Sequence, residues 1–273
     1  MSLSSNLRKL IDVNAPLWAG EAEIVRTYWT SPVRTRETDK LWLRRQCWKE
    51  YAGIGDSEGE TMGMVSDLGV KLKAMVPRLD VSLDRHELRG LLEMVYTEYT
   101  HYCLFADIHD SLIGPDEPKL NANKLTPWPE EEALGSRRRE IRKTRGRIGW
   151  RSTDFTEGGY CTMYSEGGKL RGRPGLDGRI GIACQKVFDD EFGHMMRGVV
   201  GIDEEALNEG DWAELTELTM EQLRLRIYMR NAQFSQPLSE ARIREILAGK
   251  IEPIQFDFNK AQTYMTPEHA AMA

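Results

Sequence analysis

Two short motifs of the same form carry the chemistry that this sequence suggests. Glu98-Tyr-Thr-His101 and Glu191-Phe-Gly-His194 both read Glu-x-x-His. Residues three apart share one face of a helix, so each motif would present a carboxylate and an imidazole to a single point. These donors suit iron or manganese, and neither motif contains a thiolate. The repeated motif therefore predicts a metal site.

Apolar neighbours indicate that both motifs face a protein interior. A buried carboxylate or imidazole needs compensation, because a stranded charge costs on the order of several kcal/mol. Two such pairs in one core can be satisfied together by bound cations. The shared faces carry Leu91, Met94, Val95, Tyr102 and Phe105 around Glu98, and Cys184, Val187, Phe188 and Met195 around Glu191.

A dimetal site in a four-helix bundle needs one further Glu from each of two other helices. Antiparallel helices bring two residues level when both are equally far from the connecting turn. Glu157 and Glu191 are equidistant from Pro174, inside the turn sequence RGRPGLDG. Glu157 is therefore the expected partner of the second motif.

The same argument favours Glu60 as the partner of Glu98, because the two are centred on the turn sequence PRLD. Asp67 is the competitor for this role. It would lie about 9 Å too near the turn, at a rise of about 1.5 Å per residue.

Helical patterns dominate the elements that must position these residues, and no alternation typical of strands stands out. The sequence predicts an all-α fold with one domain over residues 1–273. Its core bundle would comprise about 57–108 and 152–200, with an insertion at 109–151 and C-terminal helices within 205–250. The expected helices cover 37–52, 57–76, about 82–108, 130–143, from about 152, 179–200, 212–231 and 239–248.

Composition narrows the class of protein further. The chain has 273 residues and a net charge of −6, which argues against general nucleic-acid binding. No apolar run reaches the length of a transmembrane helix or a signal peptide, so we expect a cytoplasmic protein with no membrane partner. Cys47, Cys103, Cys161 and Cys184 are scattered without a Cys-x-x-Cys pair, which argues against a zinc knuckle or a disulfide framework.

The order Glu, Glu-x-x-His, Glu, Glu-x-x-His over about 57–200 resembles the ferritin-like superfamily of dimetal-carboxylate proteins, of the diiron oxygenase type. Asp190 matches an aspartate that orients a metal-bound histidine in many members. Gly193 and Thr97 depart from the pattern, which often has Arg and Asp there. Phe105 occupies the position of the radical tyrosine of reductase subunits.

The resemblance implies a four-helix bundle with additional N- and C-terminal helices. It also implies two iron ions, with manganese possible at either site, and O2 as co-substrate. An external electron donor would support hydroxylation, N-oxygenation, desaturation or oxidative cleavage of a small organic molecule, and a homodimer is expected. The implied metal ligands are Glu60, Glu98, His101, Glu157, Glu191 and His194.

Several roles stay open at the level of sequence. Cys161, Tyr102, Tyr160 and Tyr164 could line a substrate pocket or could simply pack. Alternative functions are an iron-binding or peroxide-handling protein without an organic substrate, and an RNA-modifying hydroxylase. The basic segment Arg137–Arg147 is either a solvated helix face or a patch for an anionic or carrier-bound substrate.

Overall fold

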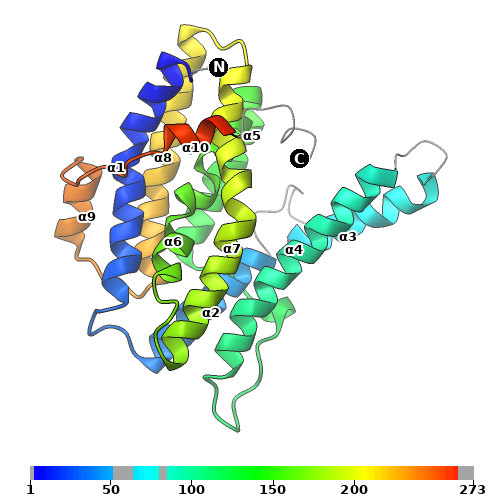
Figure 1. The fold of residues 1–273 in the computed structure, drawn as a ribbon, viewed down its shortest axis with the longest axis vertical. Coiled ribbons are helices and arrows are strands. Elements are labelled where there is room, and N and C mark those ends of the chain that lie inside the picture. The colour runs from blue at the N-terminus through cyan, green and yellow to red at the C-terminus, as the bar shows by residue number, and fades with distance from the viewer. Residues whose placement is uncertain (1–2, 52–63, 80–84, 264–273) are drawn as a thin grey trace. The chain divides into compact units, whose positions relative to one another are not determined.

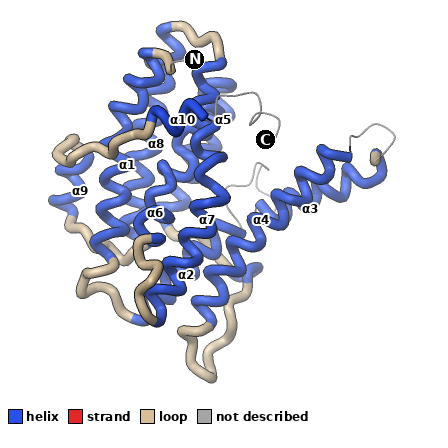
Figure 2. Tube along the Cα trace, viewed as in Figure 1, coloured by secondary structure: helices blue, strands red, loops and turns tan. Residues whose placement is uncertain are grey.

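The computed structural model describes residues 3–51, 64–79 and 85–263. All elements in these ranges are helices, which confirms the predicted all-α class (Figure 2). None of the described helices is long and apolar enough to cross a lipid bilayer. The predicted single domain and its four-helix core stay predictions.

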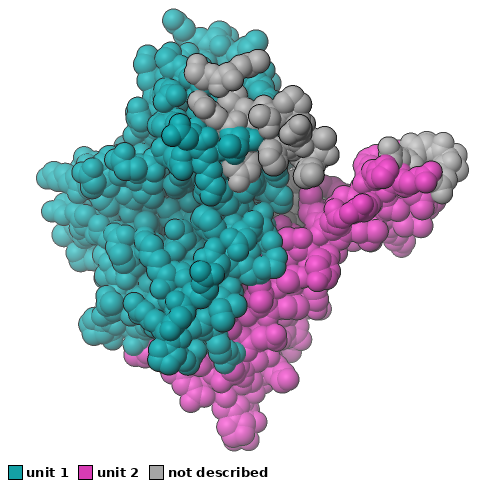
Figure 3. Space-filling model, in the orientation of Figure 1, with its two compact units in different colours: residues 1–34, 129–273 teal, residues 35–128 magenta. Residues whose placement is uncertain are grey.

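The chain divides into two compact units, which Figure 3 colours separately. Unit 1 comprises residues 1–34 and 129–273, and unit 2 comprises residues 35–128. Each unit is described by itself, over its described residues.

Unit 1 is built from long helices packed along one another (Figure 1). α8 packs against both α1 and α5, while α7 packs against α5 and α6. Short 3-10 helices, labelled η, join some of the α-helices. The bounds of the α-helices and 3-10 helices of unit 1 are α1 Ser5–Tyr28, α5 Pro129–Thr156, η3 Glu157–Cys161, α6 Thr162–Gly168, α7 Gly175–Val200, η4 Gly201–Glu204, α8 Glu209–Gln233, α9 Glu240–Leu247 and α10 Phe258–Thr263.

α1 was not among the helices that the sequence pattern predicted. It begins after Ser4, whose hydroxyl accepts a hydrogen bond from the Leu7 amide at 3.1 Å and caps the helix. It continues through Pro16, a residue that usually ends or kinks a helix. Packing of buried Trp18 and Tyr28 compensates for the lost backbone hydrogen bond.

α5 folds back on itself at Gly146, which has φ +50° and ψ −129°. The Arg138 guanidinium donates a hydrogen bond to the Thr156 carbonyl at 3.1 Å, and Arg142 lies over the Trp150 ring. A straight helix would separate residues 138 and 156 by about 27 Å. α5 is therefore a helical hairpin, whose first arm corresponds to the helix predicted over 130–143.

A left-handed turn interrupts the helix predicted from about residue 152. Gly158, Gly159, Tyr160 and Cys161 all have positive φ, between +50° and +67°. Such conformations are unfavourable for residues other than glycine. Packing supports the turn, because the Tyr160 ring stacks on Trp18 at 5.2 Å between centroids.

Unit 2 is organised around its longest helix, α4. α2 and α3 both pack against α4 (Figure 1). α3 corresponds to part of the helix predicted over 57–76, whose first residues lie outside the described ranges. The bounds are α2 Arg36–Tyr51, α3 Met64–Met75, η1 Val76–Arg78, α4 Arg85–Asp110 and η2 Ala122–Lys124.

Candidate metal centre

Contacts along α2 and α4 fix the register of these two helices. Trp42 packs edge-on against Phe105, with ring centroids 6.2 Å apart. Further along, the Cys47 thiol donates a weak hydrogen bond to the Tyr102 carbonyl at 3.9 Å. The Tyr51 ring lies 5.3 Å from the Tyr102 ring. This register places the last turn of α2 beside residues 98–102 of α4.

Glu50, Glu98 and His101 form a cluster at this position, which we call the Glu50 cluster. One potential ligand atom from each residue lies within 4.8 Å of the other two. Nδ1 of His101 is 3.8 Å from Glu50 Oε2 and 3.9 Å from Glu98 Oε2. The His101 side chain is fully buried, and those of Glu50 and Glu98 are only 7% and 16% exposed.

The donor atoms of the Glu50 cluster fit a transition-metal ion. The distances of 3.8 and 3.9 Å exceed the roughly 3.2 Å upper length of an ordinary hydrogen bond. Two atoms that each lie about 2.1 Å from one ion are about 3.0 Å apart at a right angle and at most about 4.2 Å apart. The two distances from His101 Nδ1 therefore match ligands that share an ion, and the mixed carboxylate and imidazole set suits iron or manganese.

Gln46 orients one ligand of the cluster. Its side-chain amide donates a hydrogen bond to Glu50 Oε1 at 2.6 Å, and both residues are buried. With Oε1 held in this way, Oε2 is the oxygen directed toward His101. Such outer partners fix the orientation of metal-binding carboxylates.

Glu50 was missed by the sequence reasoning, although a signal for it exists. It shares a face of α2 with Leu43 and Cys47, at spacings of seven and three residues, and all three are buried. A carboxylate on an apolar stripe is the same feature that identified Glu98 and Glu191. Glu60, the partner predicted for Glu98, lies outside the described residues.

The second motif lies on α7 in unit 1. Nδ1 of His194 is 3.4 Å from Glu191 Oε2. This contact with the Glu191 carboxylate raises the pKa of His194 although burial opposes it, and the negative charge of Glu157 also raises it. Glu191 is partly buried, whereas Glu157 and His194 are exposed. Among the residues that the structure describes, only the Glu50 cluster brings ligand atoms from three His, Cys, Asp or Glu side chains within 4.8 Å of one another.

The other predicted site residues have defined partners. Asp190, expected to orient a histidine, forms an ion pair with Lys186 at 2.5 Å. Tyr160 packs among Trp18, Phe192 and Phe256. Burial, followed by the nearby charge of Glu191, raises the pKa of the Cys161 thiol to about 12.

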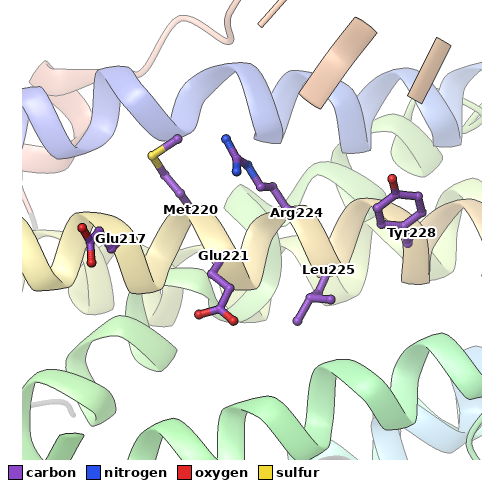
Figure 4. Close-up of a pocket in the computed structure, with 6 residues that line it drawn as sticks. All are labelled: Glu217, Met220, Glu221, Arg224, Leu225 and Tyr228. Carbon is purple, nitrogen blue, oxygen red and sulfur yellow. The ribbon is translucent and has the colours of Figure 1, made fainter. Parts of the chain in front are cut away.

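One surface depression lies along the exposed face of α8 (Figure 4). None of the residues predicted to line a substrate pocket, namely Cys161, Tyr102, Tyr160 and Tyr164, belongs to it. Its lining consists of Glu217, Met220, Glu221, Arg224, Leu225 and Tyr228.

The basic segment 137–147 is largely neutralised by carboxylates of unit 1. Arg137 makes a two-pronged ion pair with Glu221, at 2.7 and 2.9 Å. The remaining pairs join Arg139 to Glu132, Arg145 to Glu214, and Arg147 to Glu205 and Asp211. This pairing favours the solvated helix face over an anion-binding patch.

Comparison with known proteins assigns no family to the chain. No protein-family model matches it, and no curated protein or solved structure matches it significantly.

Proposed function

We propose that this protein is a non-haem metal-dependent oxidoreductase whose Glu50 cluster binds an iron ion. The observation that carries the proposal is the convergence of two carboxylates and one imidazole within 4.8 Å in a buried position. Two acidic side chains brought together away from water repel each other unless a cation or a proton compensates them. A divalent ion supplies that compensation and uses the imidazole as well.

The residues of the cluster have distinct roles in this proposal. Glu50 and Glu98 supply charge, and a neutral His101 supplies a nitrogen lone pair at Nδ1. Gln46 holds Glu50 in place, while Trp42 and Phe105 lie one to two turns away and keep this side of the helix pair apolar. An ion held by only three protein ligands would keep open coordination positions, as catalytic metal sites do. Iron, when bound, supplies the one-electron chemistry that O2 activation requires.

A second ion is part of the proposal and rests on the sequence motif. Glu157, Glu191 and His194 would hold it, with manganese as an alternative to iron at either position. The electrostatic influence of Glu157 on His194 supports their grouping in unit 1. The order of the four motifs is also what supports a ferritin-like four-helix bundle.

The substrate class that we propose is a small organic molecule, oxidised with O2 and electrons from an external donor. The alternative, an iron-handling protein, differs in one measurable respect. An oxygenase or oxidase reduces O2 repeatedly at a constant amount of bound iron when the donor re-reduces that iron, whereas an iron-handling protein consumes O2 in proportion to the free Fe(II) that is added.

The test is O2 uptake by the full-length chain, loaded anaerobically with Fe(II), desalted and supplied with a chemical reductant. We expect repeated turnovers in the wild type and in Glu93→Gln, a variant of an exposed residue on the same helix. Glu98→Gln should lose turnover while circular dichroism shows the wild-type helical content. Uptake limited to the stoichiometry of bound iron, or equal turnover in Glu98→Gln, would refute the proposal.

A further inference from the structure

α4 exposes a line of large apolar side chains on the face opposite its buried contacts. Leu92, Tyr96 and Tyr99 are 47%, 74% and 48% exposed. Their spacing of four and then three residues is that of a coiled-coil seam. The buried residues His101, Phe105 and Ile108 lie on the inner side of the helix. Over residues 98–108, α4 therefore has one packed side and one exposed side, while Met94 on the inner side is itself 49% exposed.

The exposed seam continues toward both ends of α4 with charges of opposite sign. Arg85 and Arg89 precede it on the same face, and Asp107 follows it, all three exposed. The heptad-like spacing is kept through Cys103, which is half-buried. We call this line the outer stripe of α4. It comprises Arg85, Arg89, Leu92, Tyr96, Tyr99, Cys103 and Asp107.

The outer stripe is nearly symmetric about Tyr96. Arg85 and Asp107 lie eleven residues to either side of it, and Leu92 and Tyr99 lie four and three residues away. When a helix packs antiparallel against its own copy, residues at equal distances from the centre meet. Arg85 would then face Asp107 of the second copy, and apolar side chains would fill the middle.

We propose that the outer stripe of α4 is the interface between two copies of this chain, related by a two-fold axis near Tyr96. A parallel arrangement would oppose Arg85 to Arg85 and Asp107 to Asp107, so the charges select the antiparallel one. The contact would extend over about 33 Å from residue 85 to residue 107, at about 1.5 Å per residue. Each copy contributes the same patch, as a two-fold interface requires.

This dimer does not depend on the proposed metal chemistry. Glu98 and His101 lie on the inner face of the same helix, beside α2. The interface can therefore be tested on protein without metal.

The first test measures the mass of the full-length protein in solution by sedimentation equilibrium, from about 1 to 100 µM, where small interfaces dissociate. We expect a dimer for the wild type and for Ile182→Asp, a control at a 60% exposed apolar residue of α7. Tyr96→Asp should raise the dissociation constant about 100-fold or more, because two like charges meet at the centre. A monomeric wild type, or a Tyr96→Asp variant that dimerises like the wild type, would overturn the proposal.

A charge exchange tests the antiparallel register. Arg85→Asp and Asp107→Arg should each weaken the dimer, and the double variant should restore it. Each of the four residues changed in these tests is exposed, so the variants should fold, which circular dichroism checks. Failure of the double variant to restore association would exclude this register.

Discussion

Glu21 Oε2 on α1 accepts a hydrogen bond from Arg226 Nε on α8 at 2.8 Å, and both side chains are buried. The other Glu21 oxygen accepts from Arg230 at 2.7 Å. One carboxylate thus joins the first helix of unit 1 to its longest C-terminal helix. Removing it would leave two buried guanidinium groups without a shared counter-ion.

Glu21→Gln should therefore destabilise the protein by about 3–5 kcal/mol, the cost of stranding buried charge. The measurement is urea unfolding at pH 7. Glu23→Gln is the matched control, because Glu23 lies on the same helix and pairs with Arg242 in a more exposed position. The control should lose no more than about 1 kcal/mol. Equal losses in the two variants would contradict a structural role for the buried pair.

The ion pairs of Glu21 with Arg226 and Arg230 also predict how the stability of the protein depends on pH. Burial alone would raise the pKa of Glu21, but Arg226 and Arg230 outweigh it and hold this pKa below its ordinary value of 4.5. The stability that ionised Glu21 contributes is therefore fully present above pH 4.5. It is lost as the pH falls through the pKa that Glu21 has in the folded protein, which lies below 4.5. Urea unfolding as a function of pH should show a smaller acid dependence in Glu21→Gln than in the wild type.

Gly159, in the left-handed turn, lies directly against this ion pair. Its φ is +54°, and a Cβ placed on it would collide with Glu21 Oε2 and Arg226 Nε. We expect Gly159→Ala to cost about 2–4 kcal/mol, since backbone strain adds to the loss of packing. Gly249→Ala is the control, because Gly249 also has positive φ, but no atom lies within 4 Å of the position that its Cβ would take. Gly249→Ala should lower the free energy of unfolding only by the backbone strain of alanine at positive φ, about 1–2 kcal/mol.

Cys161 should resist thiol reagents in the folded protein. With its pKa raised to about 12 by burial and by Glu191, almost none of the thiol is ionised at pH 8. Mass spectrometry after labelling at pH 8 should find half-buried Cys103 modified well before Cys161. Because the folded-state pKa is raised, the stability contributed by the neutral thiol is present below pH 9 and declines as the pH approaches 12. Rapid labelling of Cys161 under native conditions would contradict its burial.

Gln46 offers a test of the orientation of Glu50. Replacing it by Leu keeps a side chain of similar size but removes the donor to Glu50 Oε1. Metal affinity should fall about 10–100-fold, as is usual when a partner of a metal ligand is lost. Competition with a chelator of known affinity measures this change. Unaltered affinity in Gln46→Leu would mean that Glu50 needs no such support or binds no metal.

The sequence predicted the helices with the clearest apolar periodicity and missed features set by longer-range contacts. α7, α8 and α9 were predicted to within a few residues of their observed bounds. α1 was missed because Pro16 is locally unfavourable, and only packing of the folded unit overrides it. The sharp fold of α5 at Gly146 depends on contacts of Arg138 and Arg142 that no periodicity reveals.

The residues of the candidate site were likewise predicted only in part from local sequence pattern. Glu98 and His101 were predicted from the Glu-x-x-His spacing and the apolar residues around it, and the structure places them together with Glu50. The equal-distance argument considers only the helix that precedes α4. α4 contacts α2 as well as α3, so distance from the turn before α4 does not reveal Glu50, and the role of Glu60 stays a prediction.

The most direct test of the central claim is metal content per chain, measured by elemental analysis after anaerobic Fe(II) loading and desalting. Three proteins suffice: the wild type, Glu50→Gln and Glu93→Gln, each checked for helical content by circular dichroism. We predict one or two irons per wild-type chain, a loss of at least one iron in Glu50→Gln, and wild-type content in Glu93→Gln. No iron in the wild type, or full iron in Glu50→Gln, would contradict the Glu50 cluster as a metal site.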